Sequence, residues 1–238
     1  EVWREAMGLA KELGVPLHTH LCETELEVKE HRERYGKSPV EWLEELGVFA
    51  VPVLAAHCVW VDEKDIDILA AHNVSVAHCP SSNLKLASGI APVWRMLELG
   101  VNVALGTDGA ASNNTLDMVR EMRLAALLAK ARQGDPKAMP APEALATATR
   151  RGAAALGWGR YLGIIEEGYL ADLALFSREA PHWTPGHDPL ADLVYTASGA
   201  DVDTLIVGGR ILMREGKILT FDEERVKARC RELAERFR

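Results

Sequence analysis

Residues 52–79 read PVLAAHCVWVDEKDIDILAAHNVSVAHC, in which two short apolar runs lie on either side of a helical pattern. The runs PVLAAH at 52–57 and NVSVAH at 73–78 predict strands. Asp62 is placed to start a helix that continues to about Ala71. Because short apolar strands that alternate with helices form parallel sheets, this stretch predicts an α/β fold.

The same alternation continues in both directions along the chain. A charged helical region breaks near Gly36, and Ser38 as N-cap, followed by Pro39 and Glu41, predicts that a helix starts again there. The other expected elements are a helix over 1–14, a strand at 15–20, helical stretches within 24–47, a helix over 91–99, a strand at 102–108 and a helix over 115–132. Four strand–helix units are therefore expected in the first part of the chain.

The pattern changes after about residue 134. An Ala-rich helical stretch is followed by short strand-like runs, a Pro- and Gly-rich loop and a final amphipathic helix. These are expected at 142–158 (helix), 170–176, 204–207, 210–213 and 217–220 (strands), 177–192 (loop) and 222–237 (helix), with VGGR at 207–210 as a tight hairpin turn. We expect two parts, a barrel part over 1–160 and a small β appendage over 161–238.

Composition and length limit the classes of protein that this chain can be. Its 238 residues are 48% hydrophobic and 26% charged, as in an ordinary globular protein. A net charge of −8 argues against a general nucleic-acid binder, because such proteins neutralise phosphates with a basic surface. Length alone would allow one whole (β/α)8 barrel of about 250 residues, but four strand–helix units predict half of one. An open doubly wound sheet is the alternative, although no GxGxxG follows a strand.

Four cysteines without a CxxC pair predict a reducing compartment, the cytoplasm, and argue against a zinc finger. No run of about 18 apolar residues occurs, so no membrane span is expected. The chain has no initiator methionine and opens inside a helical pattern, so we expect it to start within a longer protein.

Each expected parallel strand ends in a polar residue that can do chemistry, namely His20, His57, His78 and Asp108. In βα barrels the active site lies at the carboxyl ends of the strands, and a metal needs such convergence of N and O ligands. The pair His18 and His20 alone would be a weak signal, since hydrogen-bonded histidines are common. A Cys/His zinc cluster is disfavoured, because the cysteines that follow His57 and His78 should face the opposite side of their strands.

Several motifs together resemble the amidohydrolase superfamily, and within it the 5-methylthioadenosine/S-adenosylhomocysteine deaminase group. They are LHTHLCET at 17–24, AAHCVW at 55–60, VAHCPSSNLKLASGIAPV at 76–93, LGTDGAASNNTLDM at 105–118, GYLADLALF at 168–176 and the stretch 188–218. LHTHLCET resembles equally the branches that act on 8-oxoguanine and on chloro- or amino-triazines. The resemblance covers essentially the whole chain.

The resemblance implies the C-terminal half of a metal-dependent hydrolase (β/α)8 TIM barrel, strands five to eight, plus part of a small β-sandwich. It implies one divalent metal ion, with Zn²⁺ preferred, bound by His20 and Asp108. It further implies that Glu23 contacts the substrate ring and carries a proton, and that His57 orients the attacking water. Asp108 would be the general base and would contact the substrate with Glu23. His78, Ser82 and Asn83 would help shape the pocket.

The activity implied is hydrolysis of an adenosine-type nucleoside, 5′-methylthioadenosine or S-adenosylhomocysteine, to its inosine analogue and ammonia. The partner is then a small nucleoside or nucleobase-like substrate, and neither nucleic acid nor a membrane. One alternative is a deaminase or chlorohydrolase acting on guanine-like bases or triazines. Another is a non-catalytic fragment, because the HxH that the family takes from strand one has no counterpart here. A homo-oligomer and a missing N-terminal half both remain open.

Overall fold

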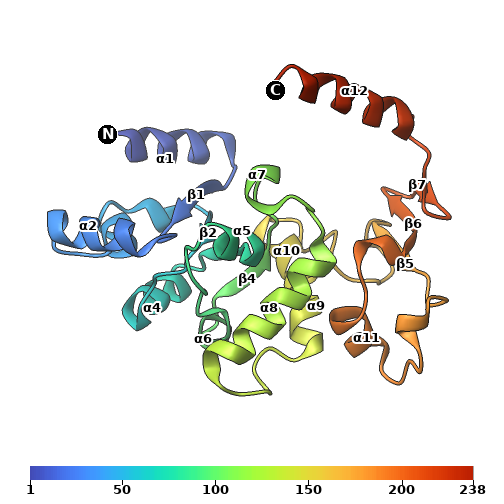
Figure 1. Ribbon diagram of the computed structural model, residues 1–238. Helices are drawn as coiled ribbons and strands as arrows, with labels where there is room; N and C mark the ends of the chain where they lie inside the picture. Colours follow the sequence, from blue (N-terminus) through green and yellow to red (C-terminus); the bar gives the residue numbers. More distant parts are fainter. Residues whose placement is uncertain (238) are drawn as a thin grey trace.

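The computed structural model describes residues 1–237, which form two four-stranded sheets (Figure 1). The first is parallel, in the order β1 (Leu17–Leu21), β2 (Val53–His57), β3 (Ser75–His78) and β4 (Asn102–Leu105). The second is antiparallel, in the order β5 (Leu173–Phe176), β6 (Val202–Val207), β7 (Arg210–Arg214) and β8 (Lys217–Ile218). The expected alternation of parallel strands with helices is confirmed.

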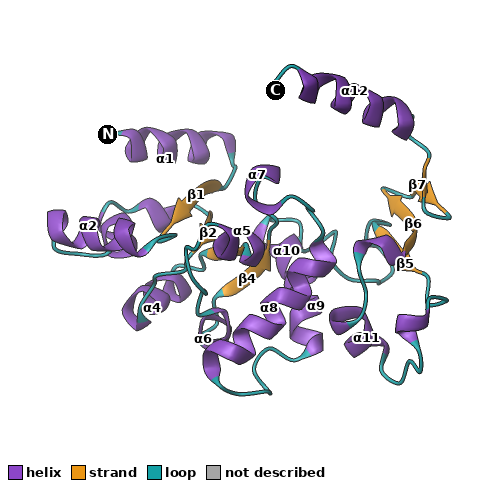
Figure 2. Ribbon diagram, viewed as in Figure 1, coloured by secondary structure: helices purple, strands orange, loops and turns teal. Residues whose placement is uncertain are grey.

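Helices surround the parallel strands and link them along the chain (Figure 2). In the first part they are α1 (Val2–Leu13), α2 (Glu25–Tyr35), α3 (Pro39–Glu45), η1 (Val48–Ala50), α4 (Glu63–Ala71), α5 (Pro80–Lys85), α6 (Val93–Glu98), α7 (Ala110–Asn113), α8 (Met118–Gln133), α9 (Ala141–Ala148) and α10 (Arg150–Ala155). Later along the chain come η2 (Pro181–Trp183), α11 (Pro189–Tyr195), which packs against α8 and α9, η3 (Gly199–Asp201) and α12 (Glu223–Glu235).

The helix boundaries follow the local signals in the sequence. Gly14 and Gly36 end α1 and α2 in the left-handed conformation, which glycine adopts without a Cβ clash. Ser38 accepts a hydrogen bond from the backbone of Glu41, whose side chain bonds back to Ser38, so the expected capping box is present. Asp62 caps α4 in the same way.

Parallel pairing brings the ends of the first four strands to one edge of the sheet. Leu21 pairs with His57, and His78 pairs with Leu105, so the strands end at similar heights. Every residue of β2 is buried, because this strand lies between β1 and β3 and its sheet is covered by helices. The register therefore places the residues that follow each strand close together.

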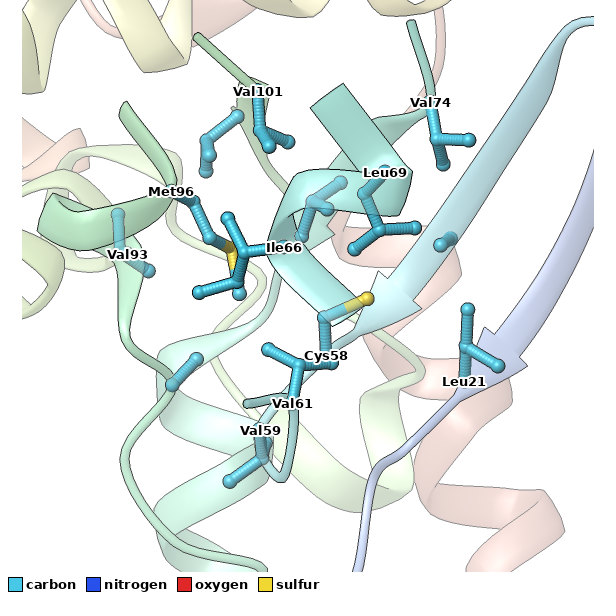
Figure 3. Packing of buried hydrophobic residues seen from close by; sticks show 14 of the residues in the cluster. Leu21, Cys58, Val59, Val61, Ile66, Leu69, Val74, Val93, Met96 and Val101 are labelled. Carbon is cyan, nitrogen blue, oxygen red and sulfur yellow. The ribbon is translucent and has the colours of Figure 1, made fainter. Parts of the chain in front are cut away.

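The main hydrophobic core lies between this sheet and the helices that cover it. Figure 3 shows Leu69 and Ile66 of α4 packed with Met96 of α6 and with Val101, which precedes β4. Cys58 packs in the same cluster, which confirms that it is a small buried hydrophobe pointing away from the strand ends.

Several local expectations were wrong. The loop expected over 177–192 contains η2 and the first residues of α11, because Asp188 caps that helix and Pro189 takes its first turn, where proline is tolerated. The single helix expected over 142–158 is split at Thr149 into α9 and α10. The short helices α5 and α7 were not expected at all.

The C-terminal helix α12 extends from the second sheet, and none of its described residues is buried (Figure 1). Within residues 1–237, no helix combines the length and the apolar character needed to cross a bilayer.

Candidate active site

Four polar side chains lie at the carboxyl edge of the parallel sheet. His20 is on β1, His57 and His78 end β2 and β3, and Asp108 follows β4. His57 and Asp108 both have positive φ angles, 74° and 59°. Such angles are uncommon for residues other than glycine, and they cluster at functional sites.

His57 links the other groups of the site. It is 1% exposed, and its Nδ1 lies 2.8 Å from Asn83 Oδ1. On its other side, Nε2 lies 3.7 Å from Glu23 Oε2. The His20 ring stacks on the His57 ring with centroids 5.4 Å apart. Residues of β1, β2 and α5 therefore meet at this imidazole.

Glu23 follows β1 and is half-buried beside His57. Its Oε1 accepts a hydrogen bond of 3.3 Å from the hydroxyl of Ser88. Ser88 is itself 5% exposed, and its carbonyl accepts a 2.6 Å hydrogen bond from Trp60 Nε1. The carboxylate of Glu23 is thus held from one side and leaves Oε2 facing His57.

Asp108 lies in an exposed turn, and its carboxylate accepts three hydrogen bonds. Its Oδ2 accepts hydrogen bonds from Ser82 Oγ at 2.6 Å and Ser112 Oγ at 2.8 Å, and Oδ1 accepts from the Gly109 amide at 2.7 Å. The Ser82 hydroxyl, with these other donors, holds the pKa of the Asp108 carboxyl below its usual range. Asp108 is therefore an ionised carboxylate at neutral pH.

His78 is buried beside this group and behaves differently. Burial, with a smaller contribution from His57, lowers its pKa from 6.5 to about 3, so its imidazole stays neutral. Its Nδ1 has no hydrogen-bond partner within residues 1–237. The His78 side chain therefore lines the site as an uncharged imidazole and does not supply a proton at pH 7. His18, two residues before His20 on β1, is exposed.

The cysteines near the strand ends are unsuited to binding zinc as thiolates. Burial raises the pKa of the Cys79 thiol to about 12, and it also raises the pKa values of Cys22 and Cys58 well above the usual range. The thiolate is the form that binds metal, so these buried thiols stay protonated and inert.

His20 and Asp108 offer the imidazole nitrogen and carboxylate oxygen that zinc prefers, so the donor chemistry fits this metal. In the described part of the chain, however, no group of three or more His, Cys, Asp or Glu side chains is placed to hold an ion. These residues therefore account for two of the donors that a tetrahedral site needs.

Some residues that contact the site residues were expected to shape the pocket, and others were not expected from the sequence. Ser82 and Asn83 were expected to shape the pocket, and they contact Asp108 and His57 directly. Glu27, Ser88 and Ser112 were not singled out. For Glu27 a signal existed, since Thr24 followed three residues later by Glu27 has the spacing of a capping box.

Comparison with known proteins identifies the family of this chain. The model of the family described as "Amidohydrolase family" matches residues 1–212. A 5-methylthioadenosine/S-adenosylhomocysteine deaminase of Pelotomaculum thermopropionicum is 50% identical over 98% of this chain and 54% of its own length. A 5′-deoxyadenosine deaminase of Methanopyrus kandleri is 47% identical over 99% of this chain and 54% of its own. The chain thus spans about half the length of the curated relatives it matches.

Solved structures agree with this likeness. An adenosine deaminase from Xanthomonas campestris with bound zinc gives a TM-score of 0.95 at 38% identity, over 98% of this chain and 53% of that one. An atrazine chlorohydrolase from Arthrobacter aurescens, complexed with zinc, gives 0.87 at 32% identity, over 95% and 50%. These likenesses confirm the expected fold class, half of a (β/α)8 barrel with part of a small β-sandwich.

Proposed function

Because the chain belongs to the amidohydrolase family, we propose that it carries the acid–base residues of a metal-dependent hydrolytic deaminase. The substrate is an adenosine-type nucleoside, 5′-methylthioadenosine or S-adenosylhomocysteine, which becomes the inosine analogue and releases ammonia. The observation that carries this proposal is the convergence of Glu23 and Asp108 on the buried His57 at the edge of the parallel sheet. The names of the deaminase relatives support the substrate class.

His20 and Asp108 would be among the donors that hold the one divalent ion of this site, Zn²⁺. When bound, zinc supplies a Lewis acid that makes water acidic enough to attack near pH 7. The zinc reported in two related structures supports this choice.

Asp108 is the general base. Its ionised form is stabilised by Ser82 and Ser112, which both donate to Oδ2, so Oδ1 has the greater free capacity to accept a proton. A carboxylate in this position takes a proton from the attacking water and passes it to the leaving amine.

Glu23 carries the second proton. Ser88 holds Oε1, so Oε2 is the atom that donates to the ring nitrogen of the substrate and makes the neighbouring carbon electrophilic. His57 donates its Nδ1–H to Asn83 Oδ1 and presents Nε2, the acceptor nitrogen of the neutral ring, toward the same space, where it orients the attacking water.

Two other candidates follow from specific observations. The likeness to atrazine chlorohydrolase, 32% identical, favours a triazine or guanine-like substrate, because a chlorohydrolase can use the same acid and base. The two metal donors found in residues 1–237 favour a chain that binds metal and turns over substrate only together with donors from elsewhere.

A substrate panel separates these candidates. The zinc-loaded full-length protein is incubated with 5′-methylthioadenosine, S-adenosylhomocysteine, 5′-deoxyadenosine, guanine and a chlorotriazine, while ammonia and chloride release are measured. The proposal predicts ammonia release and loss of the adenine absorbance with the nucleosides. Turnover of guanine or the triazine alone would contradict the nucleoside assignment, and no turnover of any compound would contradict the enzyme assignment. Zinc analysis of the 238-residue chain alone tests whether it binds metal by itself.

We also propose the division of the chain into a barrel part, 1–160, and an appendage, 161–238. The two sheets, which fall on either side of this boundary, support it. The cytoplasm is the proposed location, and the four free cysteines of this chain support a reducing compartment.

A further inference from the structure

We propose that Glu27 is a positioning residue for Glu23, because the two oxygens of its carboxylate fix the backbone amides of Cys22 and Glu23. This inference rests on the proposed role of Glu23 as a proton carrier. Glu27 Oε1 accepts a hydrogen bond of 2.9 Å from the amide of Cys22, and Oε2 accepts one of 2.8 Å from the amide of Glu23. A carboxylate is the only side chain that offers two equivalent acceptor oxygens at this spacing.

The turn that Glu27 holds is conformationally demanding. Cys22 has φ of 50°, in the left-handed region that a residue with a Cβ rarely adopts. Its side chain is fully buried in the core, so the turn must place that side chain inward and Glu23 outward. Such a conformation persists only where the surroundings determine it strongly.

The carbonyls of the same turn are held from the opposite direction. The Leu21 carbonyl accepts from the Cys58 amide, and the Cys22 carbonyl accepts from the amides of Val59 and Trp60. Glu27 therefore completes the backbone hydrogen bonding of the turn, because it takes the two amides while the residues after β2 take the carbonyls.

Glu27 does not act as the third helical residue of an ordinary capping box. In α3 the side chain of Glu41 accepts from the N-cap amide of Ser38, and Asp65 does the same for Asp62 in α4. Thr24 caps α2 by accepting from the Glu27 amide, but the Glu27 carboxylate reaches past Thr24 to the two residues before it. The Glu27 carboxylate therefore holds the turn formed by Cys22 and Glu23 rather than capping the start of α2.

The position of this turn determines where the carboxylate of Glu23 lies in the site. Glu23 Oε1 lies 3.3 Å from Ser88 Oγ, and Oε2 lies 3.7 Å from His57 Nε2. A shift of about 1 Å in a reacting group can cost about 100-fold in rate. Loosening the backbone of Glu23 should therefore lower kcat, while groups that only bind the nucleoside stay in place.

The test compares Glu27→Gln with Glu41→Gln in the full-length protein. Glutamine keeps the length of the side chain but offers one acceptor oxygen, and its NH2 group would face an amide donor. Glu41→Gln is the matched control, because it changes the same N3 position of the next helix, and the Glu41 carboxylate bonds Ser38 and Lys64 rather than the turn of Cys22 and Glu23. Amide ¹H–¹⁵N resonances of Cys22 and Glu23 report the hydrogen bonds directly and need no catalysis.

We expect Glu27→Gln to move at least one of these two resonances upfield and to lower kcat for the nucleoside about 10- to 100-fold with KM little changed. Glu41→Gln should leave the two resonances and kcat within about twofold of the wild type. Unmoved Cys22 and Glu23 resonances in Glu27→Gln would overturn the inference, as would a kcat equal to that of Glu41→Gln. An inactive wild type would instead contradict the proposed function, and the resonances would still decide whether Glu27 holds the turn.

Discussion

At the scale of single residues, the site combines groups whose environments give them different protonation states. Asp108 receives three hydrogen bonds and is ionised, whereas His78 is buried and neutral. The contrast leaves Asp108 able to accept a proton, the role that we propose for it, and leaves His78 uncharged. The supporting residues Ser82, Ser88 and Asn83 create these environments and hold the reacting atoms in place.

His78 should make the protein less stable in acid. Its pKa is about 3 when folded and close to 6.5 when unfolded, so between these values the unfolded chain binds the extra proton. The free energy of unfolding should therefore rise with pH from about 3 to 6.5, with a slope of up to about 1.4 kcal/mol per pH unit, and level off above.

Chemical denaturation at pH values from 4.5 to 7.5 measures this effect. His78→Leu should flatten the slope below pH 6.5, whatever it does to stability at neutral pH. His187→Gln, which changes an exposed histidine, should keep the wild-type slope. Equal slopes for the wild type and His78→Leu would show that His78 does not titrate in this way.

The residues that we propose for the chemistry follow from the sequence pattern, but most of the contacts that support them do not. His57 and Asp108 stand at the ends of apolar runs, and this local pattern is visible in one dimension. Ser88 reaches Glu23 across 65 positions of sequence, and only the folded chain brings them together. Glu27 lies close to Glu23 in the sequence. Its contact with the Cys22 amide nevertheless depends on a left-handed turn that the sequence does not predict.

At the scale of elements, helix α3 shows how a cap can also join two helices. The Ser38 hydroxyl accepts from the Glu41 amide and donates to the carboxylate of Asp65 in α4. Ser38 is fully buried, and burial raises the pKa of Asp65, so this carboxylate depends on its partners.

Ser38→Ala should therefore cost more than a surface cap does. It removes an N-cap, worth about 1 kcal/mol, and leaves a buried carboxylate with one donor fewer, which costs about 1 to 2 kcal/mol more. Urea denaturation should show a loss of about 2 to 3 kcal/mol. Ser198→Ala, which alters the capping box of the short helix η3, should lose no more than about 1 kcal/mol. Equal losses in the two variants would mean that the contact with Asp65 adds nothing.

Most elements with strong local signals matched expectation, and α11 is the exception. The parallel strands and the capped helices α3 and α4 lie close to the residue ranges that the sequence predicts for them. The loop expected over 177–192 is wrong at its end, because Pro189 does not break a helix there but lies in the first turn of α11. The short α5 and α7 have too few residues to show a helical period.

At the scale of the whole molecule, the chain carries the acid and the base that we propose for the site together with the two proposed metal donors, His20 and Asp108. Glu23 comes from β1, His57 from β2 and Asp108 from β4, so the four-stranded sheet is the scaffold that unites them. The chain covers 54% of its Pelotomaculum relative, and two donors fall short of a complete tetrahedral site. The catalytic unit we propose therefore needs further donors in addition to the residues described.

Ammonia release from 5′-methylthioadenosine by the zinc-loaded full-length protein, wild type against Glu23→Gln, tests the central claim most directly. General acid catalysis typically contributes about 100- to 10,000-fold, so the loss of the Glu23 proton should lower kcat by at least about 100-fold while zinc content stays the same. A wild type that releases no ammonia, or a Glu23→Gln protein that releases it at the wild-type rate, would contradict the account.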